Sequence, residues 1–229
     1  MRWTSGRPPR DTAPLADLGP WEQLRAGRLR LRVTQLLGGL VLYGVSLALM
    51  VRGALGLAPW DVLHSGLIEH LPLSLGQMVV LVSFAVLLLW IPLRERPGLG
   101  TLANAVVVGI ATDATLAVTT EPDAVWARGT LMVLGVLLNA SATALYIGAQ
   151  LGRGPRDGLM TGLARRTGLS LRLVRTTLEV TVVLAGLALG GALGAGTVLY
   201  ALTIGPLAQL ALPWTTVRLD PARGSRRDG

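Results

Sequence analysis

The sequence predicts an all-α polytopic membrane protein, with six transmembrane helices arranged as two inverted-topology repeats of three helices each. Three observations lead to this fold class. The composition is strongly apolar, the charged residues are confined to segments between apolar runs, and one stretch of the chain occurs twice. Each repeat is expected to contain one short half-helix that begins at a Pro-x-Asp sequence.

Composition excludes several classes of protein. Of the 229 residues, 51% are hydrophobic and 15% are charged, and the mean hydropathy is +0.55. A soluble domain carries about 25% charged residues, so the balance indicates a membrane protein. The net charge of +8 comes from arginines that cluster between the apolar runs, as membrane topology requires, so no nucleic-acid partner is expected. The absence of cysteine excludes disulfides and thiolate metal ligands.

The duplicated stretch is Leu55–Leu75, with the sequence LGLAPWDVLHSGLIEHLPLSL. It returns 96 residues later as Leu151–Leu171, LGRGPRDGLMTGLARRTGLSL. The match continues without a gap, because GLGT at 98–101 returns as GAGT at 194–197. Identity in register over such a length indicates an internal duplication, and it defines pairs of equivalent positions in the two halves of the chain.

Six apolar runs are long enough to cross the hydrocarbon core of a bilayer. They are expected at about residues 33–50, 75–93, 101–118, 130–151, 174–193 and 197–212. The fifth run is the least hydrophobic, because it contains Arg175 and Glu179. Four tryptophans, Trp60, Trp90, Trp126 and Trp214, fall near the predicted ends of spans, where indole rings commonly lie at the membrane interface.

Arginine-rich and arginine-poor connections alternate along the chain, which places both termini in the cytoplasm under the positive-inside rule. We therefore expect a cytoplasmic Arg-rich tail (1–32), a first membrane repeat (33–119), an extracytoplasmic loop (120–129), a second membrane repeat (130–214) and a cytoplasmic tail (215–229). The expected location is the bacterial cytoplasmic membrane. Because three spans is an odd number, the second repeat enters the membrane from the opposite side, an arrangement common among secondary transporters.

The repeated segments also resemble a known family. The sequences LGLAPWDVLHSGL and GLGTLANAVVVGIATD, followed by GRGPRDGLMTGLARRTG and GTVLYALTIGPLAQ, are similar to the YczE/YitT-like family of bacterial integral membrane proteins. The resemblance covers about Val33–Val217, and the short C-terminal tail is closer to the YczE branch. It implies a membrane location and a duplicated fold, and it implies no particular substrate.

The Pro-x-Asp sequences are the first candidates for a functional site. Proline suits the first position of a helix, and an acid in the first turn faces the unpaired N–H groups and the positive end of the helix dipole. Helices of about residues 59–69 and 155–166 are too short to span, so each would be interfacial or re-entrant. Either Asp61 and Asp157 only cap these helices, or they and Arg156 lie at a midplane binding site, as in transporters with broken helices.

Ionisable and polar residues inside spans are costly, so each is either part of a structural pair or part of a lined cavity. Asp113 lies at a depth where Arg52 could pair with it, and Arg175 lies four residues before Glu179. Asn104 is a further polar residue within a span. We take these five residues, together with Asp61, Arg156 and Asp157, as candidate substrate-binding residues.

No catalytic or metal site is expected. His64 follows Asp61 by three residues, yet no third metal ligand is evident, and no serine or threonine has a recognisable base. The small-xxx-small pairs Ala105–Gly109 and Ala201–Gly205 predict close packing of the third and sixth spans.

Two functions follow from these observations. The first is a small-solute or ion transporter with its site between the repeats. The alternative is a non-transporting membrane regulator or scaffold that binds a cytoplasmic partner through its Arg-rich inner surface. The expected partners are the lipid bilayer and an unidentified small solute or ion, and a homo-oligomer stays open; no cofactor is expected.

Overall fold

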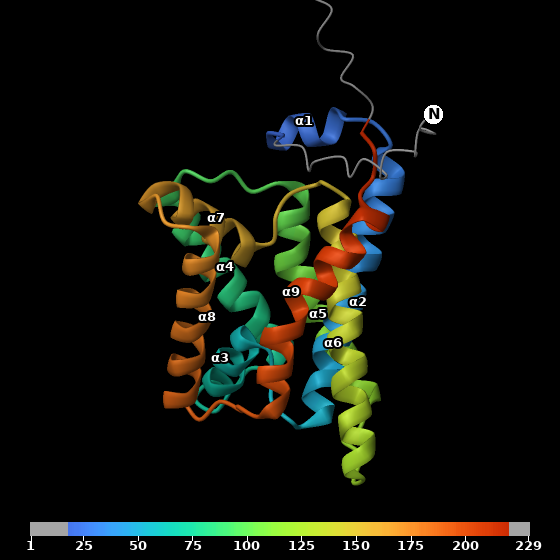
Figure 1. The fold of residues 1–229 in the computed structure, drawn as a ribbon, viewed down its shortest axis with the longest axis vertical. Helices are drawn as coiled ribbons and strands as arrows, with labels where there is room; N and C mark the ends of the chain where they lie inside the picture. The colour runs from blue at the N-terminus through green and yellow to red at the C-terminus, as the bar shows by residue number, and fades with distance from the viewer. Residues whose placement is uncertain (1–17, 220–229) are drawn as a thin grey trace, which may run out of the picture.

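The computed structural model describes residues 18–219, so the predicted tail residues 1–17 and 220–229 lie outside the described part. All regular structure within 18–219 is helical (Figure 1). The helices are α1 (Pro20–Arg25), α2 (Leu29–Gly53), α3 (Pro59–Ile68), α4 (Leu75–Leu93), α5 (Leu99–Val118), α6 (Val125–Gly148), α7 (Pro155–Thr167), α8 (Leu171–Ala188) and α9 (Ala195–Thr215).

Five of these helices, α2, α4, α5, α6 and α9, are long and apolar enough to cross a membrane. The protein is therefore an all-helical membrane protein in its described part. Helix α8 is not among the five, although it is 18 residues long, and it carries Arg172, Arg175 and Glu179. The short helices α3 and α7 begin at Pro59 and Pro155, as the Pro-x-Asp sequences predict.

Several predicted boundaries differ from the structure; α8 ends at Ala188, before its predicted end, and other helices are extended. Helix α2 begins at Leu29, inside the segment assigned to the N-terminal tail, and a break at Gly27 and Arg28, both with positive φ, separates it from α1. Helix α6 begins at Val125, so the connection from α5 is shorter than the predicted loop, and α9 extends to Thr215. Each extended helix continues past the apolar run because backbone hydrogen bonds do not depend on side-chain polarity.

The helices form two groups. The core group contains α2, α5, α6 and α9, with α2 packed most extensively against α6. The flanking group contains α3, α4, α7 and α8, in which α3 packs on α8 and α4 packs on α7. The groups are joined mainly where α4 contacts α5, and in Figure 1 the flanking group lies on the left and the core group on the right. Helices α3 and α7 lie near opposite ends of the molecule (Figure 1).

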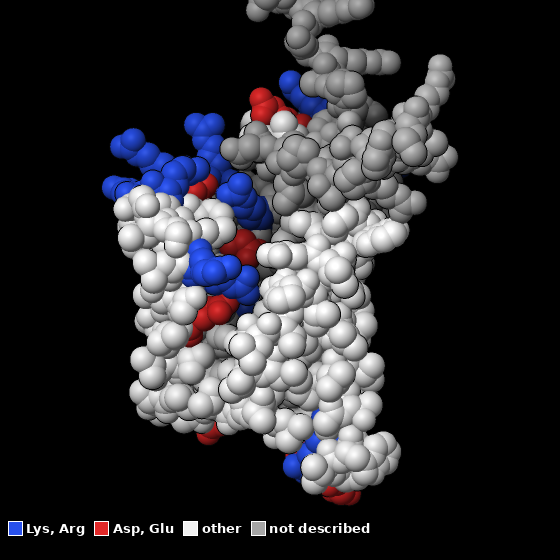
Figure 2. All heavy atoms as spheres, viewed as in Figure 1, with Lys and Arg blue, Asp and Glu red and all other residues white. Residues whose placement is uncertain are grey.

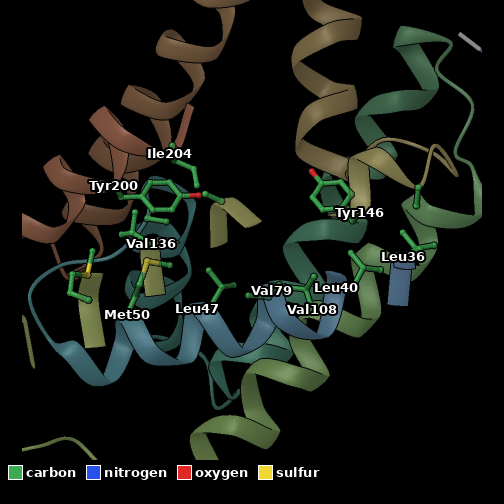
Figure 3. Packing of buried hydrophobic residues seen from close by; sticks show 14 of the residues in the cluster. Leu36, Leu40, Leu47, Met50, Val79, Val108, Val136, Tyr146, Tyr200 and Ile204 are labelled. Atoms are coloured by element: carbon green, nitrogen blue, oxygen red, sulfur yellow. The ribbon is translucent and has the colours of Figure 1, made fainter. Parts of the chain in front are cut away.

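Small residues allow the core helices to approach closely, which matters because lipid tails leave little hydrophobic drive for helix association. A Cβ on Gly44 would lie 2.6 Å from the Val108 carbonyl oxygen in α5, and one on Gly39 would lie 2.9 Å from the Tyr146 amide nitrogen in α6. Leu36, Leu40, Leu47 and Met50 of α2 fill the centre of the buried cluster (Figure 3). Helix α2 is therefore the centre of the core group.

Reciprocal hydrogen bonds join the two repeats. The amide of Gly196, at the start of α9, donates to the Leu55 carbonyl at 2.7 Å, and the amide of Gly100, at the start of α5, donates to the Leu151 carbonyl, also at 2.7 Å. Leu55 and Leu151 are repeat equivalents, as are Gly100 and Gly196. Gly56 and Gly152, which follow the two leucines, have φ values of 114° and 124°, a region that favours glycine. The two hydrogen bonds therefore join equivalent positions, with the donor in one repeat and the acceptor in the other in each case.

Two expectations about individual residues were wrong. Trp60 and Trp90 are buried in the protein, so their rings do not face lipid as interfacial tryptophans do, whereas Trp126 and Trp214 are exposed. The Trp90 indole donates to the Pro155 carbonyl at 3.0 Å, so it joins α4 to α7. Gly205 does not mediate close helix packing, because a Cβ added there meets no atom within 4 Å. Its repeat equivalent Gly109 does, since its Cβ would lie 2.4 Å from the Gly76 carbonyl oxygen in α4.

Candidate solute-binding cavity

A cavity of about 230 Å³ lies between the core group and the flanking group. It is bordered by α2, α3, α6, α7, α8 and α9, and its polar lining consists of Tyr43, Trp60, Thr143, Tyr146, Arg156, Asp157, Arg175, Glu179, Tyr200 and Gln209. Figure 2 shows acidic and basic side chains in a hollow on the face that α8 and α9 border. Helices α8 and α9 make little contact with each other, which leaves this side of the cavity open.

The starts of α3 and α7 meet at the cavity. Pro59 and Trp60 line it from α3, while Arg156 and Asp157 line it from α7. The guanidinium carbon of Arg156 lies 5.2 Å from the centre of the Trp60 ring, a cation–π contact. Trp60 and Arg156 occupy the same position in the two repeats. The positive ends of two short helices therefore converge on one place, as the second of the two alternatives for the Pro-x-Asp segments requires.

Asp61 is buried behind this contact. Its Oδ1 atom lies 2.9 Å from Nδ1 of His64 and 3.9 Å from Nη2 of Arg156. The Oδ2 atom of Asp61 and the Nε2 atom of His64 are buried without a hydrogen-bond partner among the described residues. Asp61 therefore supports Arg156 and His64 and does not line the cavity itself.

Asp157 lines the cavity and has a different partner. The Tyr146 hydroxyl donates a short hydrogen bond to Oδ2 of Asp157. The Tyr146 ring makes an edge contact with Tyr43, with ring centres 6.2 Å apart and an angle of 69° between the planes. On the opposite wall, the Tyr200 hydroxyl donates to Oδ1 of Asn139 at 3.0 Å, and Asn139 donates to Ser46 at 2.8 Å. Hydrogen bonds thus hold the aromatic walls in place.

Arg175 and Glu179 complete the charged lining. Nε of Arg175 donates to Oε1 of Glu179 at 2.8 Å, which is the i,i+4 pair that the sequence predicts. Both residues of this pair face the cavity. Candidate residues from two distant parts of the chain therefore meet in one site.

A second, smaller cavity of about 40 Å³ lies on the other side of Arg156, against α4 and α5. Its lining is the repeat equivalent of the larger cavity's lining. Equivalent pairs are Val79 and Arg175, Ser83 and Glu179, Asn104 and Tyr200, Val108 and Ile204, and Pro155 and Pro59. Tyr43, Tyr146, Arg156 and Asp157 line both cavities. The cavity is thus wide on the side of α8 and α9 and narrow on the equivalent side of α4 and α5. Asn104 lines the narrow side.

Asp113 and Arg52 do not belong to either cavity, and the predicted pairing between them is absent from the described residues. Asp113 accepts hydrogen bonds from the Ser74 hydroxyl and, at 2.8 Å, from the Gly76 amide, so it caps the start of α4. Arg52 donates to the Leu116 carbonyl at 2.6 Å. Arg52 in α2 and Asp113 in α5 were expected to pair because they were placed at similar depth. Similar depth does not make two side chains face each other, so this expectation was wrong.

Sequence reasoning missed the tyrosines. The chain has three, Tyr43, Tyr146 and Tyr200, and all of them line the larger cavity. Their signal in the sequence is that each lies inside an apolar run, and Tyr43 also lies well away from the ends where tyrosine commonly anchors a span. Among residues 18–219 no group of three or more histidine, aspartate or glutamate side chains could hold a metal ion.

Comparison with known proteins gives the following matches. Residues 30–213 match the model of a family described as a family of unknown function, DUF6198. An uncharacterized protein of Haemophilus influenzae is 41% identical over 79% of this chain and 83% of its own length. The uncharacterized membrane protein YczE of Bacillus subtilis is 33% identical over 86% of this chain and 93% of its own length. The uncharacterized protein YyaS of Bacillus subtilis is 26% identical over 76% and 89%. No solved structure matches the chain.

Proposed function

The chain belongs to the DUF6198 family and is a YczE-like membrane protein, and from this premise we propose that it is a small-solute or ion transporter that binds its substrate between two inverted repeats. The observation that carries the proposal is the 230 Å³ cavity where the starts of α3 and α7 meet. Convergent helix starts beside charged and aromatic side chains are typical of substrate sites in transporters with broken helices. A scaffold needs no such cavity.

The proposed topology has six spans, with α8 as the fifth. Both termini then lie in the cytoplasm of a bacterial cell, and residues 119–124 lie outside the cytoplasmic membrane. Two observations support it. Two of the three charges of α8, Arg175 and Glu179, line the cavity, so these two need not meet lipid, and the third, Arg172, lies in the first turn of the helix. The reciprocal bonds of Leu55 and Leu151 are what a twofold relation between the repeats requires.

The two unequal cavities suggest how substrate crosses. In the proposed cycle the wide cavity beside α8 and α9 closes while the narrow cavity beside α4 and α5 opens. Gly76 and Gly109 make the close contact on the narrow side, and their equivalents Arg172 and Gly205 do not make it on the wide side. Because the repeats are inverted in this proposal, the exchange moves access from one membrane face to the other.

A transport assay with a cavity-filling variant tests the function. Purified protein in liposomes is screened for uptake and exchange of labelled small solutes and ions. Gly205→Leu should abolish uptake of any hit, because a side chain there enters the space that Gly205 borders. Gly38→Leu is the matched control, since Gly38 is exposed on α2 and its Cβ also meets nothing within 4 Å. Hits that are equally reduced by both variants, or no hits at all, would contradict the proposal.

One observation favours the alternative of a regulator or scaffold. A cleft of about 310 Å³ lies between α1 and the ends of α4 and α7, and arginines 94, 96, 153 and 165 line it. Basic side chains also gather at this end of the molecule in Figure 2. A cytoplasmic partner with an acidic surface would fit there. Loss of cellular function in Arg94→Glu/Arg96→Glu, with solute uptake unchanged, would support the alternative over transport.

A further inference from the structure

The guanidinium group of Arg156 has unused hydrogen-bonding capacity. Within residues 18–219 its ion pair is with Asp61, at 3.9 Å, which is too long for a hydrogen bond. A guanidinium group carries five N–H donors and keeps its positive charge at any physiological pH. The side chain is only 19% exposed, so few of these donors can be satisfied by bulk water.

A second donor at the same place also lacks a partner. Trp60 lines the cavity and is 7% exposed, and its indole Nε1 has no hydrogen-bond acceptor among the described residues. The guanidinium carbon of Arg156 lies 5.2 Å from the centre of this indole ring, a cation–π contact that gives its N–H groups no hydrogen-bond acceptor. Buried donors without acceptors are rare in folded proteins, and each one needs an explanation.

The neighbouring acids do not supply the missing acceptor. Asp157 accepts from Tyr146, Glu179 accepts from Arg175, and Oδ1 of Asp61 contacts His64. Asp61 balances the charge of Arg156 from a distance without occupying its donors. Arg156 is also one of four residues that line both cavities, so a group bound to it is reachable from either side.

We infer that the cavity binds a small solute through a carboxylate group held by Arg156, an inference that rests on the proposed transport function. The planar fork of a guanidinium matches the two oxygens of a carboxylate in a bidentate pair. Part of the remaining wall is apolar, with Ile147, Ile204 and Leu212, and this part suits an apolar body, while Arg175, Glu179 and Gln209 leave polar groups for further contacts. Typical pockets for drug-sized ligands measure about 300–1,000 Å³, so a cavity of 230 Å³ suits a smaller solute.

The test is a thermal-stability titration of the purified full-length protein. Probes are small monocarboxylates such as benzoate and isobutyrate, their primary amides, neutral α-amino acids and inorganic phosphate. A ligand that binds only the folded state raises the unfolding temperature. We expect stabilisation by carboxylates or amino acids and none by the matched amides. Stabilisation by amino acids alone identifies a zwitterionic substrate, whereas stabilisation by both classes identifies the carboxylate as sufficient.

Variants assign the effect to Arg156. Arg156→Gln should weaken the apparent affinity for the carboxylate by about tenfold or more, as expected for loss of charge-assisted hydrogen bonds. Arg156→Lys keeps the charge without the fork and should lie between the wild type and Arg156→Gln. Arg172→Gln, which removes an exposed charge near the start of α8, is the control and should bind as the wild type does. If Arg156→Gln does not fold, Arg156→Lys and the amide comparison decide.

The outcomes separate this inference from the proposed function. Amides that stabilise as well as carboxylates, or stabilisation by phosphate alone, would overturn the inference. The inference would also be overturned by a different solute whose binding is lost in Gly205→Leu and unchanged in Arg156→Gln. That result would still support transport. Absence of any uptake in the liposome screen would instead count against the transport function.

Discussion

Gly109 and Gly205 are repeat equivalents, yet only Gly109 is packed against a neighbouring backbone. A Cβ on Gly109 would lie 2.4 Å from the Gly76 carbonyl oxygen, whereas one on Gly205 meets nothing within 4 Å. The same small residue therefore closes one side of the molecule and borders the open cavity on the other.

This difference predicts opposite outcomes for the same substitution. Gly109→Leu should destabilise the protein by roughly 1–3 kcal/mol or more, because overpacking forces α4 and α5 apart. Gly205→Leu should leave the unfolding temperature within the error of the wild type. The measurement is thermal unfolding in detergent, in parallel for both variants. Equal destabilisation would mean that the α8–α9 side is as closed as the α4–α5 side.

Arg32 is expected to be a major stabilising residue. It is fully buried and donates to the carbonyls of Ala149 at 2.8 Å and of Gln150 at 2.5 Å, just after the end of α6. Arg32→Met leaves these carbonyls unsatisfied, at a cost of about 3 kcal/mol or more. Arg30→Met, on the exposed side of the same turn, is the control. A stability loss under about 1 kcal/mol in Arg32→Met would show that water replaces the guanidinium.

The six-span topology predicts which positions can be labelled from outside the cell. Because the chain has no native cysteine, single-cysteine variants report one position each. Asp123→Cys and Gly190→Cys should react with a membrane-impermeant maleimide in intact cells, and Gly168→Cys should react only after permeabilisation. These three positions lie in connections between helices. External labelling at both 168 and 190 would mean that α8 does not cross the membrane.

The proposed exchange between the two cavities predicts that α8 and α9 approach each other during transport. Arg172 and Gly205 are equivalent to Gly76 and Gly109, whose backbones touch. An Arg172→Cys/Gly205→Cys variant should therefore form a disulfide under oxidation, since the two Cα atoms come within the range of about 4.4–6.8 Å. Uptake should stop on oxidation and return on reduction. A protein without this motion gives no disulfide at this pair.

Much of the fold is legible in the sequence because the two Pro-x-Asp segments mark both the short helices and the repeat. Asp157 and Arg156 follow directly from that pattern, and the spacing of Arg175 and Glu179 gives their pairing. What the sequence leaves out is the rotation of each helix about its axis. Rotation decides that Asp113 caps α4 and that Trp60 lies under a guanidinium, and it depends on contacts between distant segments.

The roles of the three cavity tyrosines could not be predicted from the sequence either. A tyrosine inside an apolar run is compatible with a buried core, an interface or a cavity, and only the hydrogen bond from Tyr146 to Asp157 and that from Tyr200 to Asn139 settle its role. Each bond joins two helices or a helix and a half-helix. Such pairings are a property of the assembled bundle, so the sequence of one segment does not contain them.

The bond between Leu55 and Gly196 sets an order of events during synthesis. The carbonyl of Leu55, in the connection between α2 and α3, receives its donor from Gly196 only when α9 has left the ribosome and entered the membrane. Until then the connection from α2 to α3 stays incomplete, however early its residues were made. Translation products that stop before α9 should therefore be recognised as unfinished and degraded by membrane proteases, even though most of their helices are already inserted.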